Sequence, residues 1–363
     1  MAKTESKVGV GIVGCGFVAH MKHLPALKEI PEAEIVSVFD FNAGRAQEVA
    51  ENFGAVGCKV CTDFEEVIRD PNVDTVYILT SNVTHSEYAV RALDAGKHVL
   101  CEKPMAMSIE EATKMMDAVE RSGKKLTIGY QCRLIPEVQY LKRVCDAGEL
   151  GHIYHARALA VRRRHIPAWG SFLNKAAQGG GCLIDMGTHA IDMALYLMNH
   201  YDVDSVMGNT YQYLGKKPTP ANATGLWDAD KFEVEDSAFA LIRMKNGATI
   251  SVDCSWALNT LEVYENKVVL CGTEAGADLL DGVRLNGEHN GVLTVTKPDL
   301  QGRSACDLPM FNKGVKKVSE SRLWIDAILN DTEPFVKPFE AYTVSRIIDG
   351  IYRSAQTGEL VKL

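Results

Sequence analysis

Short β-branched runs alternate with segments of helical spacing along the first 130 residues of the chain. Strand-like runs begin at Val8 and recur at 35–39, 75–79, 98–101 and 125–128. Apolar residues recur at helical spacing over 43–53, 84–95 and 109–122, and a glycine follows each of these segments. Thr62 and Ser108 each precede a glutamate three positions later, which is the signature of a capping box. Strands that alternate with helices predict right-handed crossovers and a parallel, doubly wound sheet.

From about residue 150 the pattern changes to longer alternating runs. Segments 237–244 and 248–256 flank Asn246-Gly247, and such a dipeptide between alternating runs is the strongest short sign of a β-hairpin. Further strands are expected at 153–161, 268–271, 283–285 and 292–295, and helices at 184–198, 318–329 and 341–357. We therefore predict an α/β protein. A Rossmann-type doubly wound domain over 1–130 precedes an α/β domain over 131–363 with a large, open, mostly antiparallel sheet.

Length and composition support two globular domains and exclude several classes of partner. A chain of 363 residues exceeds the size at which one hydrophobic core keeps growing. The net charge of −8 argues against nucleic acid as a partner, because phosphate binding needs a basic surface. No apolar run approaches the roughly 20 residues of a membrane span. The first residues lead straight into the strand at Val8 and leave no room for a signal peptide, so we expect a cytoplasmic protein.

The ten cysteines are scattered, and several lie in apolar strand-like runs, where a thiol behaves as a small hydrophobic group. Cys58-Lys59-Val60-Cys61 is the only C-x-x-C, and it has no second pair at the spacing of a zinc site. We therefore expect neither a disulfide framework nor a metal, and the role of Cys58 and Cys61 stays open.

A glycine-rich turn follows the first strand-like run. Gly14-Cys15-Gly16-Phe17-Val18-Ala19 fits G-x-G-x-x-A between a strand and a helix, the context in which this motif binds a dinucleotide. Gly14 allows a sharp turn, Gly16 lets backbone N–H groups approach a pyrophosphate, and Ala19 lets the helix pack closely on the strand. An ordinary glycine-rich turn is the alternative, but the motif lies within the first 20 residues of the chain, where a Rossmann unit begins.

Polar residues at the ends of the next strand-like runs complete the predicted cofactor site. Asp40 can accept hydrogen bonds from the adenosine ribose and repels a 2′-phosphate, so NAD is favoured over NADP. Arg45 is the counterargument, since it can bind that phosphate or serve as a solvated helix charge. Thr80, Asn82 and His85 follow a strand end, where open α/β sheets bind ligands, and are predicted cofactor contacts. The alternative is a plain polar loop that caps the next helix.

Two further groups of residues carry chemistry. Lys103, in Glu102-Lys103-Pro104, follows a strand end and can stabilise negative charge on a reacting oxygen, or is a solvated lysine. Three glycines at 179–181, which suggest close approach to a ligand or another backbone, precede a helix with Asp185, His189 and Asp192 on one face. A histidine one turn from a carboxylate suits a general base, whereas a metal pair lacks further ligands. A buried structural histidine is the remaining alternative.

Several motifs, taken in order along the chain, resemble the Gfo/Idh/MocA family of oxidoreductases. They are Gly14-x-Gly16-x-x-Ala19, Thr80-x-Asn82-x-x-His85, Glu102-Lys103-Pro104, Gly180-Gly181-x-x-x-Asp185-x-Gly187-x-His189-x-x-Asp192, Gly272-Thr273-Glu274 and 351–355. The resemblance covers nearly the whole chain. It implies NAD(P)-dependent oxidation of a secondary hydroxyl, most often on a sugar or cyclitol. It also implies a C-terminal sheet that forms homodimers or homotetramers.

The resemblance also implies roles for individual residues. Lys103, Asp185 and His189 match the active-site residues, with His189 as the usual proton acceptor, and Lys103 and His189 are expected at one face of the nicotinamide ring. Cofactor contacts are implied for Phe17, Val18, Glu102 and Gln131, and substrate contacts for Tyr130, Arg163, Trp169, Asp185 and His189. The alternative for the loop of Arg163 and Trp169 is a solvated basic edge of the sheet. Cys182 departs from the residue of many relatives, and its role stays open.

We therefore expect an NAD-dependent dehydrogenase of a pyranose sugar or glycoside, with oxidation of C3 to a 3-keto sugar as the specific hypothesis. His189 would remove the hydroxyl proton, Lys103 would hold the oxygen, and Asp185 would position the histidine or a neighbouring hydroxyl. The alternatives are a redox-neutral glycosidase that uses NAD, an inositol dehydrogenase, and a non-enzymatic nucleotide-binding sensor. The intact set of Lys103, Asp185 and His189 argues against the sensor.

Overall fold

The structure, a computed structural model, describes residues 7–300 and 319–363. By their contacts, the described residues up to 129 and from 319 to 342 form one compact unit, and those from 130 to 300 and from 343 to 363 form another. The sequence-based division placed all of 131–363 in one domain, whereas the contacts group the segment of α9 (Glu320–Leu329) with the first unit. Residue 318, where that helix was expected to begin, lies outside the described residues. Helix α10 (Pro338–Thr357) continues from the first unit into the second.

Buried side chains explain why α9 groups with the first unit. Trp324 and Ile325 are buried in the same hydrophobic core as Val10 and Leu27. The indole N–H of Trp324 donates a 2.9 Å hydrogen bond to Oγ1 of Thr75, although the two residues lie 249 positions apart. A buried indole needs such a partner for its N–H group. The grouping of α9 therefore follows from contacts between residues far apart in the sequence.

The first unit contains the predicted parallel sheet, which has the strand order β3-β2-β1-β4-β5-β6 with parallel pairs throughout. Its strands are β1 (Val8–Val13), β2 (Ala33–Phe39), β3 (Lys59–Val60), β4 (Thr75–Ile78), β5 (His98–Cys101) and β6 (Leu126–Ile128). The order reverses between β1 and β4. In doubly wound sheets a ligand binds outside the carboxyl ends of the strands at this switch point.

The helices of the first unit are α1 (Leu24–Lys28), α2 (Ala43–Phe53), α3 (Phe64–Arg69), α4 (His85–Asp94), α5 (Ile109–Ser122) and α9. The cap expected at Ser108 is confirmed, because its hydroxyl accepts the N–H of Glu111, and Gly123 ends α5 with a φ of +63°. The cap expected at Thr62 is wrong by one residue. Asp63 accepts the N–H of Glu66 instead, so the helix starts one position later.

The second unit contains a sheet in the order β14-β13-β12-β11-β7-β10-β9-β8-β15, antiparallel except for the parallel pair β7–β10. Its strands are β7 (Ile153–Val161), β8 (Val203–Tyr211), β9 (Ser237–Met244), β10 (Thr249–Ser255), β11 (Tyr264–Gly272), β12 (Gly276–Asp278), β13 (Arg284–His289), β14 (Val292–Thr296) and β15 (Val361–Lys362). Asn246-Gly247 joins β9 to β10 as predicted, and Gly247 has a φ of +88°. The predicted α/β fold, with a doubly wound parallel sheet and a second, mostly antiparallel sheet, is thus confirmed.

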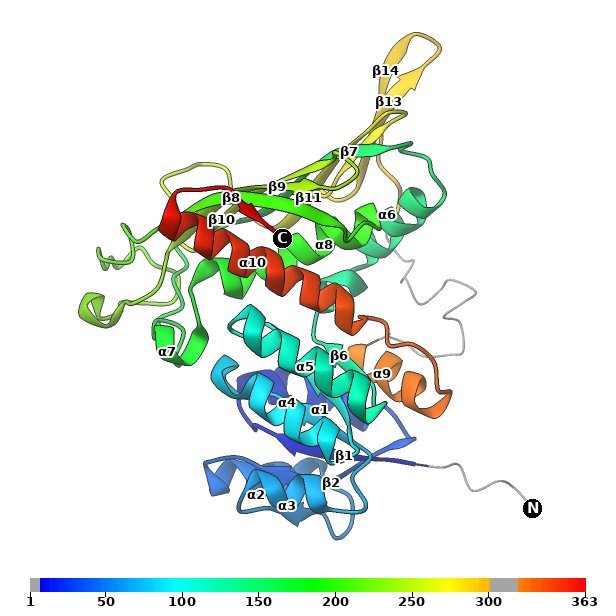
Figure 1. Ribbon diagram of the computed structural model, residues 1–363, viewed down its shortest axis with the longest axis vertical. Coiled ribbons are helices and arrows are strands. Elements are labelled where there is room, and N and C mark those ends of the chain that lie inside the picture. The colour runs from blue at the N-terminus through cyan, green and yellow to red at the C-terminus, as the bar shows by residue number, and fades with distance from the viewer. Residues whose placement is uncertain (1–6, 301–318) are drawn as a thin grey trace. The chain divides into compact units, whose positions relative to one another are not determined.

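Figure 1 shows α6 (Pro136–Asp146), α8 (Thr188–Met198) and α10 on the same face of the sheet in the second unit. The helix expected over 184–198 divides into a π-helical turn, Leu183–Gly187, and α8. A π-helical turn carries more residues per turn than an α-helix and often occurs at functional sites. It changes the directions of Asp185 and His189 from those expected for one regular helix.

Candidate active site

The glycine-rich loop after β1 fits a dinucleotide. Gly14 has a φ of +95°, and a Cβ at this position would lie 2.7 Å from the carbonyl of Leu79, so only glycine is tolerated. A Cβ at Gly16 would meet nothing within 4 Å, so the loop leaves open space in front of this residue. Ala19 is fully buried where the helix packs on the sheet. A close turn, open space beside backbone N–H groups and a helix start are what a pyrophosphate needs.

Asp40, at the end of β2, fixes this loop. Its Oδ2 accepts the N–H of Cys15 at 2.7 Å, and its Oδ1 accepts the N–H of Asn42 at 2.7 Å. A carboxylate offers about four lone-pair directions, so capacity is left for ribose hydroxyls. The helix after the loop begins with a π-helical turn, Ala19–His23, and Phe17 beside the loop is largely exposed.

His85 connects two loops at the same edge of the sheet. Its Nδ1 lies 2.8 Å from the carbonyl oxygen of Pro104, and its Nε2 lies 3.1 Å from that of Thr80. The ring is buried, and burial lowers the pKa of His85 below its usual value. The structure therefore places His85 between the loops that carry Thr80 and Lys103. A direct contact of His85, Thr80 or Asn82 with the cofactor stays a prediction.

Glu102 lies in a buried group of charges. Its Oε1 is 2.7 Å from Nζ of Lys22 and 2.7 Å from Nε2 of His23, and its Oε2 accepts the N–H of Lys103 at 3.2 Å. Burial favours the protonated acid, but the Lys22 charge and the His23 hydrogen bond outweigh burial and hold the pKa of Glu102 well below its usual range. A Cβ at Gly129 would lie 3.1 Å from this carboxylate. Glu102 thus anchors Lys103, while its predicted contact with the cofactor stays untested.

Glu320 of α9 belongs to the same group and forms an ion pair with Lys22. Among the described residues, His23, Glu102 and Glu320 bring their ligand atoms within 4.8 Å of one another, a spacing that suits a metal ion. The ammonium of Lys22 contacts both carboxylates and supplies the positive charge that a metal would bring. We therefore assign no metal to this group.

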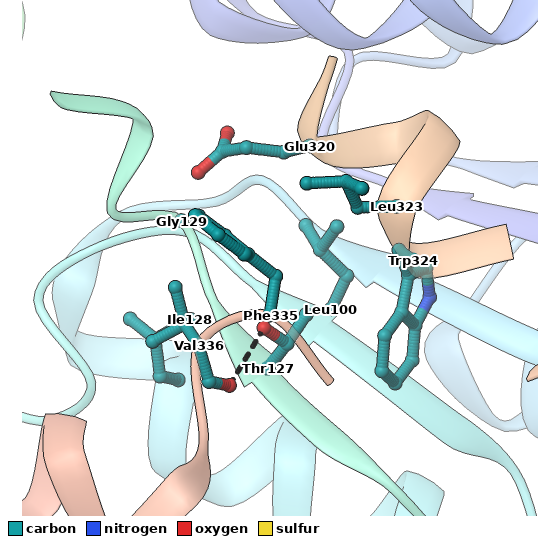
Figure 2. A pocket seen from close by; sticks show the side chains of 9 residues that line it. All are labelled: Leu100, Thr127, Ile128, Gly129, Glu320, Leu323, Trp324, Phe335 and Val336. Atoms are coloured by element: carbon teal, nitrogen blue, oxygen red, sulfur yellow. Dashed lines mark hydrogen bonds between the residues drawn. The ribbon is translucent and has the colours of Figure 1, made fainter. Parts of the chain in front are cut away.

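Figure 2 shows a small cavity beside Glu320, lined also by Gly129, Leu100 and Trp324. Its volume of about 10 Å³ is close to what one water molecule needs. The hydroxyl of Thr127 donates to the carbonyl of Val336 across its floor at 3.0 Å. This cavity is too small for a sugar or a nucleotide.

In the second unit, Asp185 and His189 lie on and just after the π-helical turn. Oδ2 of Asp185 accepts the indole N–H of Trp256 at 3.0 Å, and Trp256 is fully buried. The ring of Tyr130 meets that of His189 edge-to-face with centroids 6.1 Å apart, and the Tyr130 hydroxyl bonds Oγ1 of Thr188 at 2.9 Å. Tyr130 is itself buried, so its position supports the histidine. Its predicted contact with substrate stays a prediction.

Asp192, expected on one helix face with Asp185 and His189, pairs with an arginine. It is fully buried and receives two N–H groups of Arg133, Nη2 at 2.6 Å and Nε at 2.9 Å. Arg133 lies in the 3-10 turn that begins with Gln131, a predicted cofactor contact, and its guanidinium also stacks over Tyr196. The structure thus gives Asp192 a structural partner in Arg133. Its carboxylate neutralises a buried arginine, and the pair joins this turn to α8.

The glycines before Asp185 face protein groups. A Cβ at Gly180 would lie 2.0 Å from the hydroxyl of Tyr352, and one at Gly181 would lie 2.0 Å from the carbonyl of Glu235. The Glu235 carboxylate accepts the N–H of Gly181 at 2.8 Å, that of Leu183 at 3.0 Å and the Tyr352 hydroxyl at 2.9 Å. The sequence predicted that these glycines allow close approach either to a ligand or to another backbone. At Gly181 the close neighbour is the backbone of Glu235. Sequence reasoning missed Glu235 and Trp256, which no motif marks.

Cys182, whose role the sequence left open, packs against β10. The Cys254 thiol donates to its carbonyl oxygen at 3.0 Å, and both cysteines are fully buried. Burial raises the pKa of the Cys182 thiol well above its usual range, so it stays protonated. The half-buried thiol of Cys58 also has a raised pKa, of about 11, for the same reason. Neither environment is that of a reactive thiolate.

The three arginines after β7 differ in their contacts. Arg162 forms an ion pair with Glu265, and Arg164 donates to the side chain of Asn259 and to the carbonyl of Leu258. Arg163 is exposed, and its guanidinium makes no hydrogen bond or ion pair within residues 7–300 and 319–363. Trp169, farther along the same loop, is 51% exposed. The structure thus leaves Arg163 and Trp169 open to solvent, as contact with a substrate requires.

Two family models match this chain. The oxidoreductase family model with an NAD-binding Rossmann fold matches residues 8–130, and the GFO/IDH/MocA C-terminal domain model matches residues 138–278. The chain belongs to the Gfo/Idh/MocA family. It is therefore an oxidoreductase with an NAD-binding domain. No helix within the described part of the chain is long and apolar enough to cross a membrane.

Curated members of the Gfo/Idh/MocA family are similar over much of the chain. D-glucoside 3-dehydrogenase of Escherichia coli (strain K12) is 33% identical over 362 residues, which cover 100% of this chain and 99% of the relative. Levoglucosan dehydrogenase of Pseudarthrobacter phenanthrenivorans is 29% identical over 273 residues, 68% of this chain and 67% of the relative. A solved levoglucosan dehydrogenase in complex with NADH and levoglucosan shares the fold. Its TM-score is 0.81 at 24% identity, and the match covers 98% of this chain and 99% of that one.

Proposed function

We propose that this chain is an NAD-dependent dehydrogenase that oxidises a secondary hydroxyl of a pyranose sugar or glycoside. The observation that carries the proposal is the hydrogen bond from Trp256 to Asp185, which fixes a carboxylate four positions before His189 on a buried turn. The names of the relatives, a glucoside dehydrogenase and a levoglucosan dehydrogenase, support a sugar as the substrate. The whole-length similarity to the first of these supports oxidation at C3 of a glucoside as the specific reaction.

Each residue has a distinct part in the proposed reaction. The substrate hydroxyl transfers its proton to the imidazole of His189, because a neutral imidazole offers a ring nitrogen that accepts a proton. The ammonium of Lys103 donates a hydrogen bond to the same oxygen and stabilises the negative charge that develops there. Asp185 orients the histidine or a neighbouring hydroxyl. Arg163 and Trp169 bind other parts of the sugar or glycoside. NAD supplies the hydride acceptor when bound.

The residues proposed to hold the cofactor lie along the glycine-rich loop and the adjacent strand ends. Gly14 and Gly16 shape the loop, Phe17 and Val18 border it, and Asp40 accepts hydrogen bonds from the ribose. Thr80, Asn82 and Gln131 are proposed to add polar contacts. The negative charge of Asp40 supports NAD over NADP.

The proposal is tested by assaying a panel of sugars, glycosides and cyclitols with NAD and with NADP, with release of reduced nicotinamide as the readout. We expect NADH to accumulate with at least one pyranose or glycoside. Accumulation with cyclitols alone would indicate an inositol dehydrogenase. Cleavage of a glycoside without free NADH would indicate the redox-neutral glycosidase. No turnover with any compound, while NAD binds, would contradict the dehydrogenase.

The roles of the catalytic residues are tested with His189→Ala. We expect turnover to fall by about two to four orders of magnitude, the usual contribution of a general base, while NAD still binds. Lys103→Met is the companion variant and is expected to lower kcat more than it raises KM. Unchanged turnover in His189→Ala, with NAD affinity intact, would remove the proposed mechanism.

We also propose that copies of the chain associate through the sheet of the second unit into a homodimer or homotetramer. Met207 of β8 and Leu241 of β9 are register partners, and they are 51% and 49% exposed. Adjacent half-exposed apolar side chains on a sheet support burial against another copy.

A further inference from the structure

A row of aromatic side chains leads from Asp185 to the surface of the second unit. The buried indole of Trp256 donates to Oδ2 of Asp185 at 3.0 Å. The ring of Phe172 meets that of Trp256 edge-to-face with centroids 6.5 Å apart, and Trp169 meets Phe172 in the same way at 5.9 Å. Exposure rises along the row, from the fully buried Trp256 to the half-exposed Trp169. Successive contacts therefore join a solvent-facing indole to the carboxylate of the proposed catalytic site.

Nearly buried amide side chains anchor the loop on both sides of Trp169. Asn222 accepts the N–H of Ile166 at 2.8 Å and donates to its carbonyl at 3.0 Å. On the other side, the amide of Gln178 donates to the Ser171 hydroxyl at 2.7 Å. Loops fixed before a ligand arrives lose less conformational entropy on binding. The position of Trp169 is thus set by the protein before any ligand binds.

We propose that Trp169 and Phe172 form a subsite for the part of a glycoside that does not react, either an aromatic aglycone or a second sugar ring. The inference rests on the proposed function, because it takes the reacting sugar to lie at Asp185. A sugar held there lies near Trp256, so Phe172 and then Trp169, the next two rings of the row, are placed for whatever is attached to that sugar. An aryl group and the C–H face of a sugar ring both present flat apolar surfaces that pack against an indole.

An alternative role for these rings is to pack the loop as a small hydrophobic core. Half of the Trp169 surface is exposed, however, and the loop already has anchors in the hydrogen bonds of Asn222 to Ile166 and of Gln178 to the Ser171 side chain. A ring needed only for packing gains most when it is fully buried. The exposure of the Trp169 ring on a loop that is already anchored favours a role in binding a ligand.

The test compares three forms of the sugar that the panel identifies: its methyl glycoside, its phenyl glycoside and a disaccharide. kcat/KM with NAD is measured for the wild type, Trp169→Ala, Trp169→Phe and Phe172→Leu. We expect the wild type to prefer the two larger substrates, and Trp169→Ala to lower that preference about tenfold. Trp169→Phe should keep most of it. The substrate whose kcat/KM falls more in Trp169→Ala, the phenyl glycoside or the disaccharide, identifies the group that the subsite binds.

Tyr154→Ala is the matched control, because Tyr154 is 52% exposed near the first residue of β7, whereas the loop of Trp169 follows the last one. In this variant the ratio of kcat/KM for the larger substrates to that for the methyl glycoside should equal the ratio in the wild type. Calorimetric binding of the same glycosides in the presence of NAD separates the two hypotheses. If binding of the larger forms depends on Trp169 but no NADH is released, the subsite stands and the proposed dehydrogenase fails. The subsite proposal is overturned if the wild type shows no higher kcat/KM for the larger substrates. It is also overturned if Trp169→Ala lowers kcat/KM equally for all three substrates.

Discussion

The indole N–H of Trp256 donates a hydrogen bond to Oδ2 of Asp185 at 3.0 Å, which ties the end of strand β10 to the π-helical turn before His189. The two residues lie 71 positions apart. Trp256 is fully buried, so its donor has few other partners within reach. This bond sets the direction of the carboxylate beside the proposed general base.

Trp256→Phe removes this donor and keeps an aromatic ring. Hydrogen bonds to charged groups contribute about 1.5–3 kcal/mol, so we expect kcat/KM for the sugar to fall about tenfold to a hundredfold. Trp324→Phe is the control, because it removes a similarly buried indole donor, to Thr75, in the first unit. Steady-state kinetics and thermal unfolding are measured for both. If Trp256→Phe loses stability alone and keeps kcat/KM, the bond has no part in catalysis.

Asp40→Asn tests the choice of cofactor. Asparagine keeps an oxygen that can accept the N–H of Cys15, but it removes the negative charge that repels a 2′-phosphate. We expect the ratio of kcat/KM for NAD to that for NADP to fall about tenfold, chiefly through a gain with NADP. Asp94→Asn, which removes an exposed carboxylate paired with Arg121, should leave the ratio unchanged. An unchanged ratio in Asp40→Asn would show that other groups select the cofactor.

Lys22→Met leaves Glu102 and Glu320 buried without their shared cation. Removing one partner of a buried ion pair destabilises a protein by about 3–5 kcal/mol, and we expect a loss of that size at pH 7 in urea unfolding. Because the pKa of Glu102 is held well below its usual 4.5, its ionised form stabilises the fold above that value. That stability is lost as the pH falls through the folded-state pKa.

The difference in stability between wild type and Lys22→Met should therefore narrow in acid. Adding Glu320→Gln to the variant removes one of the two uncompensated carboxylates, and should restore part of the loss at pH 7. Burial raises the pKa of Glu320 above its usual value, whereas the Lys22 charge lowers it. A difference that stays constant from pH 7 to pH 4 would show that Lys22 stabilises the fold by packing alone.

Leu241→Arg places a charge in the proposed interface of the second sheet. Burying an unpaired charge between two copies is strongly unfavourable, so we expect the mass from light scattering to fall from the oligomer to a smaller species. Val56→Arg adds the same charge at an exposed aliphatic residue of the first unit and is the control. A wild type that is monomeric, or a variant that keeps the full mass, would contradict the interface.

Local signals in the sequence were sufficient for most elements of the first unit. Helix α5 begins after Ser108 and ends before Gly123 as predicted, because a cap and a left-handed glycine depend on only a few neighbouring residues. The hairpin at Asn246-Gly247 is predictable for the same reason. The glycine motif after β1 predicted the sharp turn that Gly14 makes with a φ of +95°, and the family was recognisable from motifs along the whole chain.

Only the tertiary structure decided how residues far apart in the sequence meet. The sequence pattern placed Asp192 beside His189, but Arg133 neutralises it, and helical spacing carries no information about a partner on another element. Gly180 and Gly181 are required by Tyr352 and Glu235, which no local pattern connects to them. The grouping of α9 with the first unit and the bond from Trp256 to Asp185 have the same origin. Conformational preference acts over a few residues, whereas burial and buried hydrogen bonds are satisfied by whichever residues the complete fold brings together.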